Sequence, residues 1–429
     1  MDQSLDYRLT AARPGRFIRE VPVAIQTGPK IAFGLLVVFL VMLYSSIAVL
    51  VPSLIALRPV LVVAFAAIGI MVVELTMSRQ HIRAMWPYTY FLAAFLGVAA
   101  VSTFSALYAR KAFDTTLDLS KIVLIYIVIE NTVTSESRLK KVFLTLAFGG
   151  MFPAIGTIYH YMNGILIEGS RSSWLGVFKN PNEDAYSLAV LVPITAALAA
   201  NAKWYFRVLL WGMIGIYIVA IFLTFSRGGL LGLVAALGLI CWKQKSFLLR
   251  VVMIVGLVGG MAVAAAFWTR GRDFKNVDQD TTFRQRIATV IAGGYMFLDN
   301  PLLGVGPGNS MVAYPLYVPK DYLDCGCETQ LVIHNAFIQV LSEMGALGFI
   351  LFMSLLGLTL IESRTMQTGP MAPYAAALEI GLWVFVVCGL TNGFTYTWSP
   401  YLLFGLIVAA RRIADSRGTD AGQGLNEIG

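Results

Sequence analysis

Long apolar stretches recur along the chain from residue 31 to residue 410, separated for the most part by short polar segments. Many exceed the roughly 18 apolar residues that identify a membrane-spanning helix. The predicted spans are 31–51, 55–77, 88–108, 117–133, 142–162, 185–200, 208–225, 228–242, 248–268, 334–361, 375–390 and 400–410. The pattern therefore predicts an all-α integral membrane protein with about twelve transmembrane helices.

One polar segment, residues 269–333, is much longer than the other connections and follows the ninth predicted span. A polar stretch of this length is incompatible with the hydrocarbon layer, so we expect a partly helical loop outside the membrane. The predicted organisation is an N-terminal segment (1–30), nine spans with short loops (31–268), this loop, three further spans (334–412) and a polar tail (413–429), which we expect to be disordered.

The positive residues of the connections orient these spans. With the N-terminus in the cytoplasm, every inner connection carries Lys or Arg, whereas the long outer loop is nearly neutral. Arg110 and Lys111 are an exception on the outer side. We expect both termini in the cytoplasm. The basic residues of the inner side are Arg79, Arg83, Arg138, Lys140, Lys141, Lys203, Arg207, Lys243, Lys245, Arg250, Arg364, Arg411 and Arg412.

Composition agrees with a membrane protein and excludes a soluble one. Charged residues make up 13% of the chain and the mean hydropathy is +0.73, whereas a soluble domain has about a quarter charged residues. The net charge of +8 belongs to the inner loops and does not indicate nucleic-acid binding. Residues 1–30 contain no short apolar core with a cleavage site, so we expect the first helix to remain as an uncleaved anchor.

Arg227 lies between two apolar stretches, in the sequence Ser226-Arg227-Gly228-Gly229 on the predicted outer side. An Arg costs roughly 2.5–3.5 kcal/mol at the centre of a bilayer and less at its surface. It either extends to the lipid headgroups or binds a phosphate, because the guanidinium fork matches phosphate oxygens. Ser226 and the two glycines would let the free amides of a helix N-terminus approach the same anion.

A second outer connection, residues 163–183, contains Arg171, Lys179 and Asn182. Its aromatic residues suit the interfacial belt of a membrane protein, and the Asn-Pro-Asn sequence at 180–182 suits a turn and a helix cap. Composition alone favours an ordinary loop. In the long loop, Arg284 and Arg286 open a helical stretch, and the glycine-rich residues 302–309 follow it. These lack the context of a nucleotide-binding loop, so we expect a tight re-entrant turn.

His334 lies where the long loop meets the tenth predicted span, next to Asn335 and before Glu343 in the apolar helix. A single interfacial His is more often structural than catalytic, yet His334 titrates near neutral pH and is the natural general base of this loop. Glu343 is costly in a membrane unless it is paired or faces a cavity. His81 is predicted on the inner side and His160 near the outer cavity.

No metal or other cofactor is expected. The chain has no His-Glu-x-x-His sequence, and Cys325 and Cys327 lack a second pair of ligands at the usual spacing. A disulfide between these two cysteines would be strained by their close spacing. Burial in or beside apolar spans is enough to explain Cys241 and Cys388.

Three motifs, taken in order, resemble the bacterial O-antigen ligase and polymerase superfamily, most closely the lipopolysaccharide O-antigen ligases. They are residues 171–182, residues 225–229, and a long-loop pattern that runs from Arg286 through residues 299–309 to residues 334–345. The resemblance implies a polytopic glycosyltransferase at the periplasmic face of the bacterial inner membrane. Its donor would be a glycan on undecaprenyl pyrophosphate. Its acceptor would be lipid A–core oligosaccharide in a ligase, or a second lipid-linked glycan in a polymerase.

The resemblance also assigns roles to residues of this chain. His334 would deprotonate the acceptor hydroxyl as it attacks the anomeric carbon, and this single displacement would invert that centre. Neither a metal nor a nucleotide sugar would be needed. The residues that would bind the pyrophosphate and stabilise its charge are Arg171, Arg227 and Arg286, with Arg284 and Lys179 as secondary candidates and Asn335, Glu343 and Asn182 as possible support.

Alternatives remain at this point. One dominant outer loop favours a ligase, because polymerases of the superfamily often have two sizeable outer loops. Members that transfer glycans to Ser or Thr of proteins are a further alternative. A transporter of lipid-linked sugars is less expected, because transporters commonly show two similar halves, and the long loop has no counterpart in the first half of this chain.

Overall fold

The computed structural model describes residues 28–244, 246–267, 281–325 and 330–426. Within these ranges the chain is helical, has one isolated β-bridge between Ile167 and Arg171, and contains no β-strand. This confirms the all-α class. A disulfide between Cys325 and Cys327 and the fate of residues 1–27 are expectations that lie outside the described residues.

The helices follow one another along the chain. In order, the helices are α1 (Ile31–Ser45), α2 (Ile47–Leu50), α3 (Pro52–Ile55), α4 (Pro59–Met77), α5 (Tyr88–Phe104), α6 (Ala109–Thr132), α7 (Glu136–Gly149), α8 (Met151–Met162), η1 (Gly176–Phe178), α9 (Pro181–Ala200), α10 (Trp204–Leu223), α11 (Arg227–Trp242), α12 (Phe247–Phe267), α13 (Thr281–Asp299), α14 (Ser310–Tyr317), η3 (Lys320–Cys325), α15 (Ala336–Thr365), α16 (Ala372–Gly389) and α17 (Trp398–Asn426).

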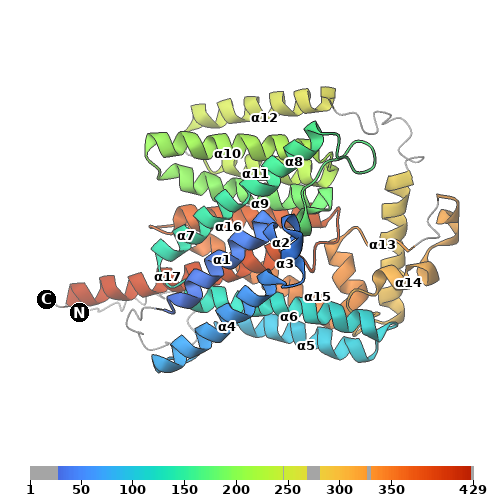
Figure 1. The fold of residues 1–429 in the computed structure, drawn as a ribbon, viewed down its shortest axis with the longest axis horizontal. Coiled ribbons are helices and arrows are strands. Elements are labelled where there is room, and N and C mark those ends of the chain that lie inside the picture. The colour runs from blue at the N-terminus through green and yellow to red at the C-terminus, as the bar shows by residue number, and fades with distance from the viewer. Residues whose placement is uncertain (1–27, 245, 268–280, 326–329, 427–429) are drawn as a thin grey trace, which may run out of the picture.

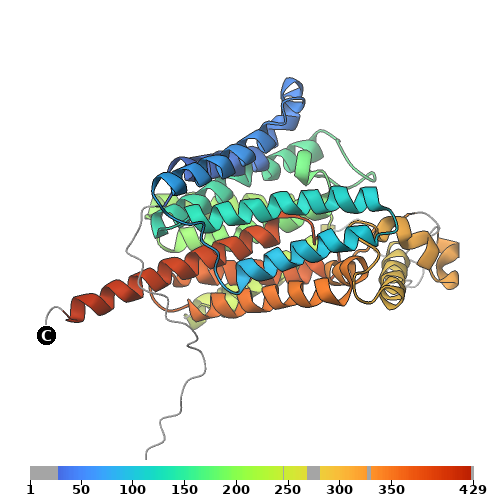
Figure 2. The ribbon, with the colours of Figure 1, turned by 90° about the horizontal axis from the view of Figure 1, so that it is seen from below.

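The long helices run side by side in one bundle, and α13 and α14 lie at one end of it, with α13 crossing the direction of the bundle (Figures 1 and 2). The central helices are α9, which packs against α7, α10, α11 and α16, and α16, which also packs against α15 and α17. At the opposite end α17 projects beyond the other helices. The described part of the predicted long loop, residues 281–325, therefore forms a helical cap on one end of an apolar bundle.

Helices occupy all twelve predicted apolar stretches. Among the described residues, six helical stretches are long and apolar enough to cross a membrane: Ser53–Met77, Glu136–Met162, Pro181–Ala200, Trp204–Leu223, Ala336–Thr365 and Ala372–Gly389. The first predicted span is broken, because Ser46 adopts a left-handed conformation with φ of 53° between α1 and α2. An α-helical membrane protein is supported, and the total of twelve spans stays a prediction.

Basic residues predicted to share the inner side meet in space. Lys243, after α11, and Arg364, in the last turn of α15, both contact Glu379 of α16, at 2.7 Å and 2.8 Å. Arg411 of α17 contacts Glu362 at 2.9 Å. These contacts link α11, α15, α16 and α17. The orientation of the helices in the membrane stays a prediction.

The last helix extends beyond the final predicted span. α17 continues to Asn426, whereas that span ended at residue 410, and the disorder expected for residues 413–429 stays a prediction. Extending an existing helix avoids the cost of nucleating a new one, and Arg411 pairs with Asp415 one turn later at 3.0 Å. The helix therefore runs on past the apolar residues that begin it.

A kink in α15 receives the glycine-rich turn that follows α13. Gly345 has non-helical dihedral angles, with φ of 62°, and this interrupts the backbone hydrogen bonds of the helix. The turn replaces them: the amides of Val305 and Gly306 donate to the carbonyls of Ser342 and Glu343 at 2.9 Å and 3.0 Å. A broken helix at membrane depth is tolerated where such partners satisfy its backbone. The predicted tight turn at 302–309 thus packs directly on α15.

Gly345→Ala is expected to lower the melting temperature of the detergent-purified protein. A Cβ at this position would lie 2.3 Å from the carbonyl carbon of Leu302, and a left-handed residue other than Gly costs about 1–3 kcal/mol. Gly357→Ala is the matched control in the same helix, because no atom lies within 4 Å of its added Cβ and Ala favours a helix interior. Equal melting temperatures for the two variants would contradict this role of the kink.

Candidate functional site

Arg171 is buried, with 5% of its surface exposed, in the connection between α8 and α9. The β-bridge to Ile167 closes a tight turn that places its side chain against the end of α10. The guanidinium donates to the backbone carbonyl of Thr224 at 3.1 Å and to Oδ1 of Asn182 at 2.6 Å, and it lies 3.6 Å from Glu168. Several bonds therefore fix one orientation of this guanidinium.

Asn182 joins the first two sequence motifs. Its Oδ1 accepts from Arg171 and also from the hydroxyl of Ser226 at 2.8 Å. Ser226 in turn caps α11, because its hydroxyl oxygen accepts from the amide of Gly229 at 3.2 Å. Arg227 is the first residue of α11 and is half-buried. The side-chain amide of Asn182 thus links Arg171 to Ser226, the residue that precedes Arg227.

A buried carboxylate, that of Asp184 in the first turn of α9, holds the connection between α8 and α9 in place. Its Oδ2 accepts from the hydroxyl of Thr157 in α8 at 2.5 Å and from the amide of Trp174 at 3.3 Å. Nearby, Nδ1 of His160 lies 2.7 Å from the carbonyl of Ser173. His160 therefore contacts the backbone of the connection that carries Arg171. Sequence analysis did not single out Asp184, although a carboxylate opening an apolar helix was a usable signal.

Arg286 and His334 flank one small core at the capping end. Ala288, Ala292 and Met296 of α13 pack there with residues of α14 and with Ile333, the neighbour of His334. A Cβ on Gly293 would lie 2.6 Å from the side chain of Ile338, so α13 sits directly on the first turn of α15. This packing brings together two sequence positions that are nearly fifty residues apart.

His334 faces two positive charges. Burial, followed by the positive charges of Arg286 and Arg171, lowers the pKa of His334 from 6.5 to about 4. These three residues, which come from three different segments, therefore lie close enough to interact electrostatically. The imidazole is neutral at pH 7, and this is the form that can accept a proton.

Asn335 fixes the backbone next to His334. Its side-chain Oδ1 caps α15 by accepting from the amides of Phe337 and Ile338, both at 3.0 Å, and its Nδ2 donates to the carbonyl of Leu390 at 3.3 Å. The last contact ties the start of α15 to the end of α16. Its supporting role in the chemistry stays a prediction.

The connection between α16 and α17 links the other parts of the site and was missed by sequence analysis. A Cβ on Gly393 would lie 2.5 Å from the carbonyl oxygen of Ile333, and a Cβ on Gly228 would lie 2.2 Å from the hydroxyl of Thr391. The connection is therefore wedged between the residue before His334 and the residue after Arg227. Its Asn392-Gly393 pair was a turn signal that could have marked it.

Glu343 is buried and fully engaged by the glycine-rich turn. Its carboxylate accepts from the amide of Gly308 at 2.8 Å, from the amide and hydroxyl of Ser310, and from the hydroxyl of Tyr396 at 2.7 Å. Pairing, one of the two conditions expected for a carboxylate in this helix, is met. Glu343 thus holds the turn onto α15, and these contacts lead away from His334.

The two secondary candidates for pyrophosphate binding, Arg284 and Lys179, differ in their surroundings. Arg284 donates to the carbonyl of Asp321 at 3.1 Å, and its guanidinium lies 5.7 Å from the ring centre of Tyr322. It therefore joins α13 to η3, whereas Arg286, two residues later and on a different side of the helix, interacts with His334. Lys179 has an exposed side chain at the end of η1.

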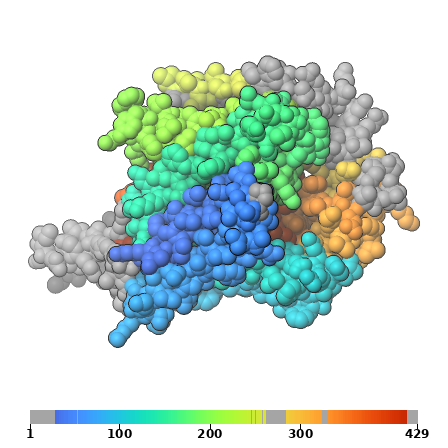
Figure 3. Space-filling view, in the orientation of Figure 1, coloured from blue at the N-terminus to red at the C-terminus, as the bar shows by residue number. Residues whose placement is uncertain are grey.

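The surface is hollowed at this end of the bundle. Figure 3 shows a depression between the blue N-terminal helices, the green residues around α8 and the orange residues of the capping segment, with orange-red residues at its floor. The green and orange surfaces that border the depression have the colours of the sequence regions that contain Arg171 and His334. The site thus combines a neutral imidazole, several guanidinium groups and an apolar bundle.

Residues 212–353 match a family model described as O-Antigen ligase. The matched region contains Arg227, Arg286 and His334, whereas Arg171 and Asn182 precede it. A search of curated proteins found no match to the chain. The family match supports membership of the O-antigen ligase and polymerase superfamily, in agreement with the resemblance of the sequence motifs.

Proposed function

We propose that this chain, whose residues 212–353 match the O-antigen ligase family model, transfers a glycan from undecaprenyl pyrophosphate to lipid A–core oligosaccharide. The transfer takes place at the periplasmic face of the bacterial inner membrane. The observation that carries the proposal is the meeting of His334 with Arg171 and Arg286 at the capped end of an apolar bundle. Such a site offers a base and an anion-binding centre beside a lipid environment.

The guanidinium groups bind the donor pyrophosphate in this proposal. Arg171 and Arg286 supply charge on the two sides of His334, and Arg227 adds a third guanidinium at the N-terminus of α11, where free amides also favour an anion. Asn182 and Ser226 hold this arrangement in place. Because these groups are fixed before the donor binds, they stabilise the negative charge that develops on the pyrophosphate as it leaves.

His334 acts as the general base. Its neutral imidazole takes the proton of the acceptor hydroxyl while the oxygen attacks the anomeric carbon of the donor glycan. The bond between that carbon and the pyrophosphate oxygen breaks, and the electron pair departs with the pyrophosphate. One displacement inverts the anomeric centre. Arg284, Lys179 and Glu343 act outside this step, as supports of the capping segment or of the surface around it.

Donor binding also adjusts the base. In the free enzyme burial, followed by the positive charges of Arg286 and Arg171, lowers the pKa of His334 to about 4, which makes it a weak base. A bound pyrophosphate offsets these two charges and therefore raises the pKa of His334 above 4, although the part of the shift that burial causes remains. The imidazole becomes a stronger proton acceptor only when the donor is in place, which couples deprotonation of the acceptor to the presence of the donor.

The pH dependence of transfer follows from this coupling. The acid limb of kcat/KM, which reports the free enzyme, is expected near pH 4, and the acid limb of kcat is expected at higher pH. Arg286→Gln should move the limb of kcat/KM upward, because one charge that lowers the pKa of His334 is gone. Steady-state rates from pH 3.5 to 8 in detergent measure both limbs. If the two acid limbs coincide and Arg286→Gln moves neither of them, the assignment of His334 as the general base is contradicted.

The choice of acceptor is tested by reconstitution. Purified protein receives one lipid-linked glycan donor together with lipid A–core oligosaccharide, and in parallel with a second lipid-linked glycan. Glycan on lipid A–core supports the ligase, whereas elongated lipid-linked glycan shows a polymerase instead. A peptide rich in Ser and Thr is added as a third acceptor for protein glycosylation. Movement of donor across vesicles without any transfer would favour a transporter over all three.

A further inference from the structure

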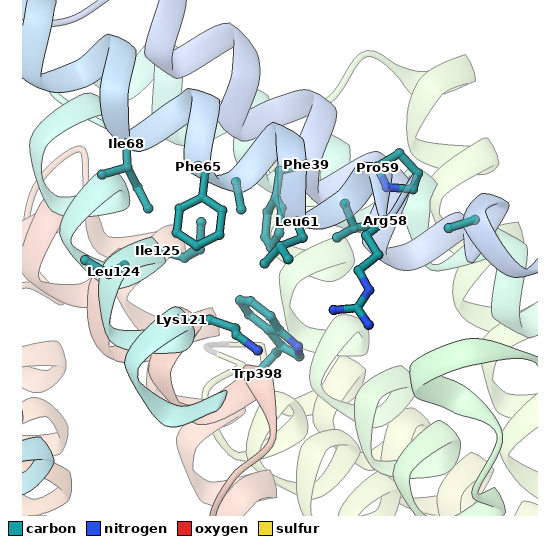
Figure 4. Close-up of a pocket in the computed structure, with 13 residues that line it drawn as sticks. Phe39, Arg58, Pro59, Leu61, Phe65, Ile68, Lys121, Leu124, Ile125 and Trp398 are labelled. Atoms are coloured by element: carbon teal, nitrogen blue, oxygen red, sulfur yellow. The ribbon is translucent and has the colours of Figure 1, made fainter. Parts of the chain in front are cut away.

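A cavity of about 230 Å³ lies between α1, α4, α6 and the first residue of α17, away from the residues proposed for glycan transfer (Figure 4). Its walls are apolar and include Phe39, Phe65 and Ile125. Two charged residues, Arg58 and Lys121, complete the lining, and both are positive. An apolar cavity with a cationic border matches an amphiphile that has an anionic headgroup.

The two cations are available to a ligand. Arg58 precedes α4 in a left-handed conformation with φ of 43°, and among the described residues its guanidinium has no hydrogen-bond or ion-pair partner. Lys121 is held by Asp118 at 2.6 Å, an exposed pair one turn apart on α6, and such pairs contribute little stability. Figure 4 shows Arg58 and Lys121 on either side of the Trp398 ring.

The apolar part of the cavity continues into the bundle. A second void, of about 20 Å³, shares Phe39, Ile125 and Trp398 with the first and extends along α6 and α17 to Tyr401. Phe39 and Trp398 form a tilted ring pair with centres 5.2 Å apart at the junction. The apolar lining of the cavity therefore continues past the two cations, and the volume that can hold a hydrocarbon segment is that of the first cavity.

The cavity lies at the capped end of the bundle. Ser46, between α1 and α2, donates from its hydroxyl to the carbonyl of Leu175 at 3.0 Å, so the segment before Arg58 touches the connection that carries Arg171. On the other side, Trp398 follows Tyr396, whose hydroxyl donates to Glu343. A ligand in this cavity would therefore contact elements that lead to both parts of the proposed site.

We propose that this cavity binds an anionic phospholipid of the surrounding bilayer, with its phosphate between Arg58 and Lys121 and an acyl chain against Phe39, Phe65 and Ile125. The guanidinium of Arg58 suits phosphate oxygens, and Lys121 adds a second positive charge. The donor pyrophosphate already has its own cations in the proposed function. A phospholipid is therefore the occupant that uses both the charge and the apolar volume of this separate cavity.

Trp398 reports the occupant directly. The wild type and Trp398→Phe are placed in phosphatidylcholine vesicles that contain increasing fractions of phosphatidylglycerol with brominated acyl chains, and the difference between their emissions gives the quenching of Trp398. Brominated phosphatidylglycerol is expected to quench at lower mole fraction than brominated phosphatidylcholine. Removing one cation should raise the fraction for half quenching about fivefold, as expected for a basic residue near an anionic lipid. The measurement is independent of glycan transfer.

Arg58→Gln and Lys121→Gln are compared with Arg110→Gln, an exposed Arg paired with Asp114 outside the cavity. The control should keep the preference for phosphatidylglycerol. Native mass spectrometry of the wild type, which should retain phosphatidylglycerol over phosphatidylcholine, covers the case in which a variant fails to fold. Equal quenching by the two lipids, or an unchanged preference in both Gln variants, overturns the proposal. So does displacement by polyprenyl phosphate at concentrations where unlabelled phosphatidylglycerol has no effect.

Discussion

His334→Ala is expected to lower the rate of glycan transfer about 10²- to 10⁴-fold, the usual contribution of a general base, while donor affinity stays close to that of the wild type. The reason is the neutral state of the imidazole: with a pKa of about 4 it contributes no positive charge to donor binding at pH 7. Loss of the side chain therefore removes the proton acceptor and leaves the guanidinium groups in place. Rates with purified donor and acceptor, together with a separate donor-binding assay, measure the two effects.

The matched control is His81→Ala, which replaces an exposed His in the connection between α4 and α5. This variant should retain wild-type transfer. The expected split between kcat and donor affinity distinguishes a base from a structural His, because collapse of the site would weaken donor binding as well. Full activity of His334→Ala with purified components would remove His334 from the mechanism.

Arg286→Ala is expected to weaken donor binding about 10- to 100-fold, since a hydrogen bond to a charged group contributes about 1.5–3 kcal/mol. The transfer rate should fall further, because the guanidinium also stabilises the charge on the departing pyrophosphate. Arg286 lies beside His334 on a helix that packs against α15, so its position is set by the capping core. Titration with a lipid pyrophosphate and single-turnover rates separate binding from chemistry.

Two further variants sharpen this expectation. Arg286→Lys keeps the charge and loses the planar fork, so it should recover only part of the donor affinity. Arg110→Ala removes a positive charge that pairs with Asp114 on the exposed surface of α6, and it should leave both quantities unchanged. Equal losses in Arg286→Ala and Arg110→Ala would mean that net charge, and not the position of Arg286, attracts the donor.

The class of fold could be predicted from the sequence because each helix of a membrane protein is one continuous apolar stretch of the chain. Apolar stretches such as 185–200 and 208–225 became α9 and α10 with shifted ends, and the described residues 281–325 of the polar stretch form α13, α14 and η3 at one end of the bundle. Helix ends were less accurate. α9 begins at Pro181 because Asn180 caps it, and its Oδ1 accepts from the amide of Asn182. That contact depends on a local geometry that hydropathy does not contain.

The candidate site was predicted in part. Motif resemblance selected Arg171, Arg227, Arg286 and His334, and the structure places three of these within electrostatic reach of one another. Arg284 lies elsewhere: its guanidinium donates to the carbonyl of Asp321 and lies near the ring of Tyr322. Arg284 and Arg286 have the same side chain and lie two positions apart, but they face different neighbours because side chains two positions apart on a helix point in different directions.

Glu343 illustrates the same limit. Its cost in an apolar helix was evident from the sequence, but its partners, Gly308, Ser310 and Tyr396, come from two segments more than thirty positions away on either side. The kink at Gly345 and the turn that fills it bring Gly308 and Ser310 to the carboxylate, and the connection between α16 and α17 brings Tyr396. The role of Glu343 as an anchor of that turn therefore required the folded chain.

By itself the sequence determined an apolar helical protein, the one long polar segment in it, the family motifs and the residues whose chemistry suits a pyrophosphate and a base. These follow from local properties: side-chain polarity, charge and order along the chain. The tertiary structure decided which of those residues meet, how the kink in α15 is satisfied, and that a cationic apolar cavity lies between α1, α4, α6 and α17. Such outcomes depend on packing between distant segments, and pairwise distances in space are not encoded by any single stretch of sequence.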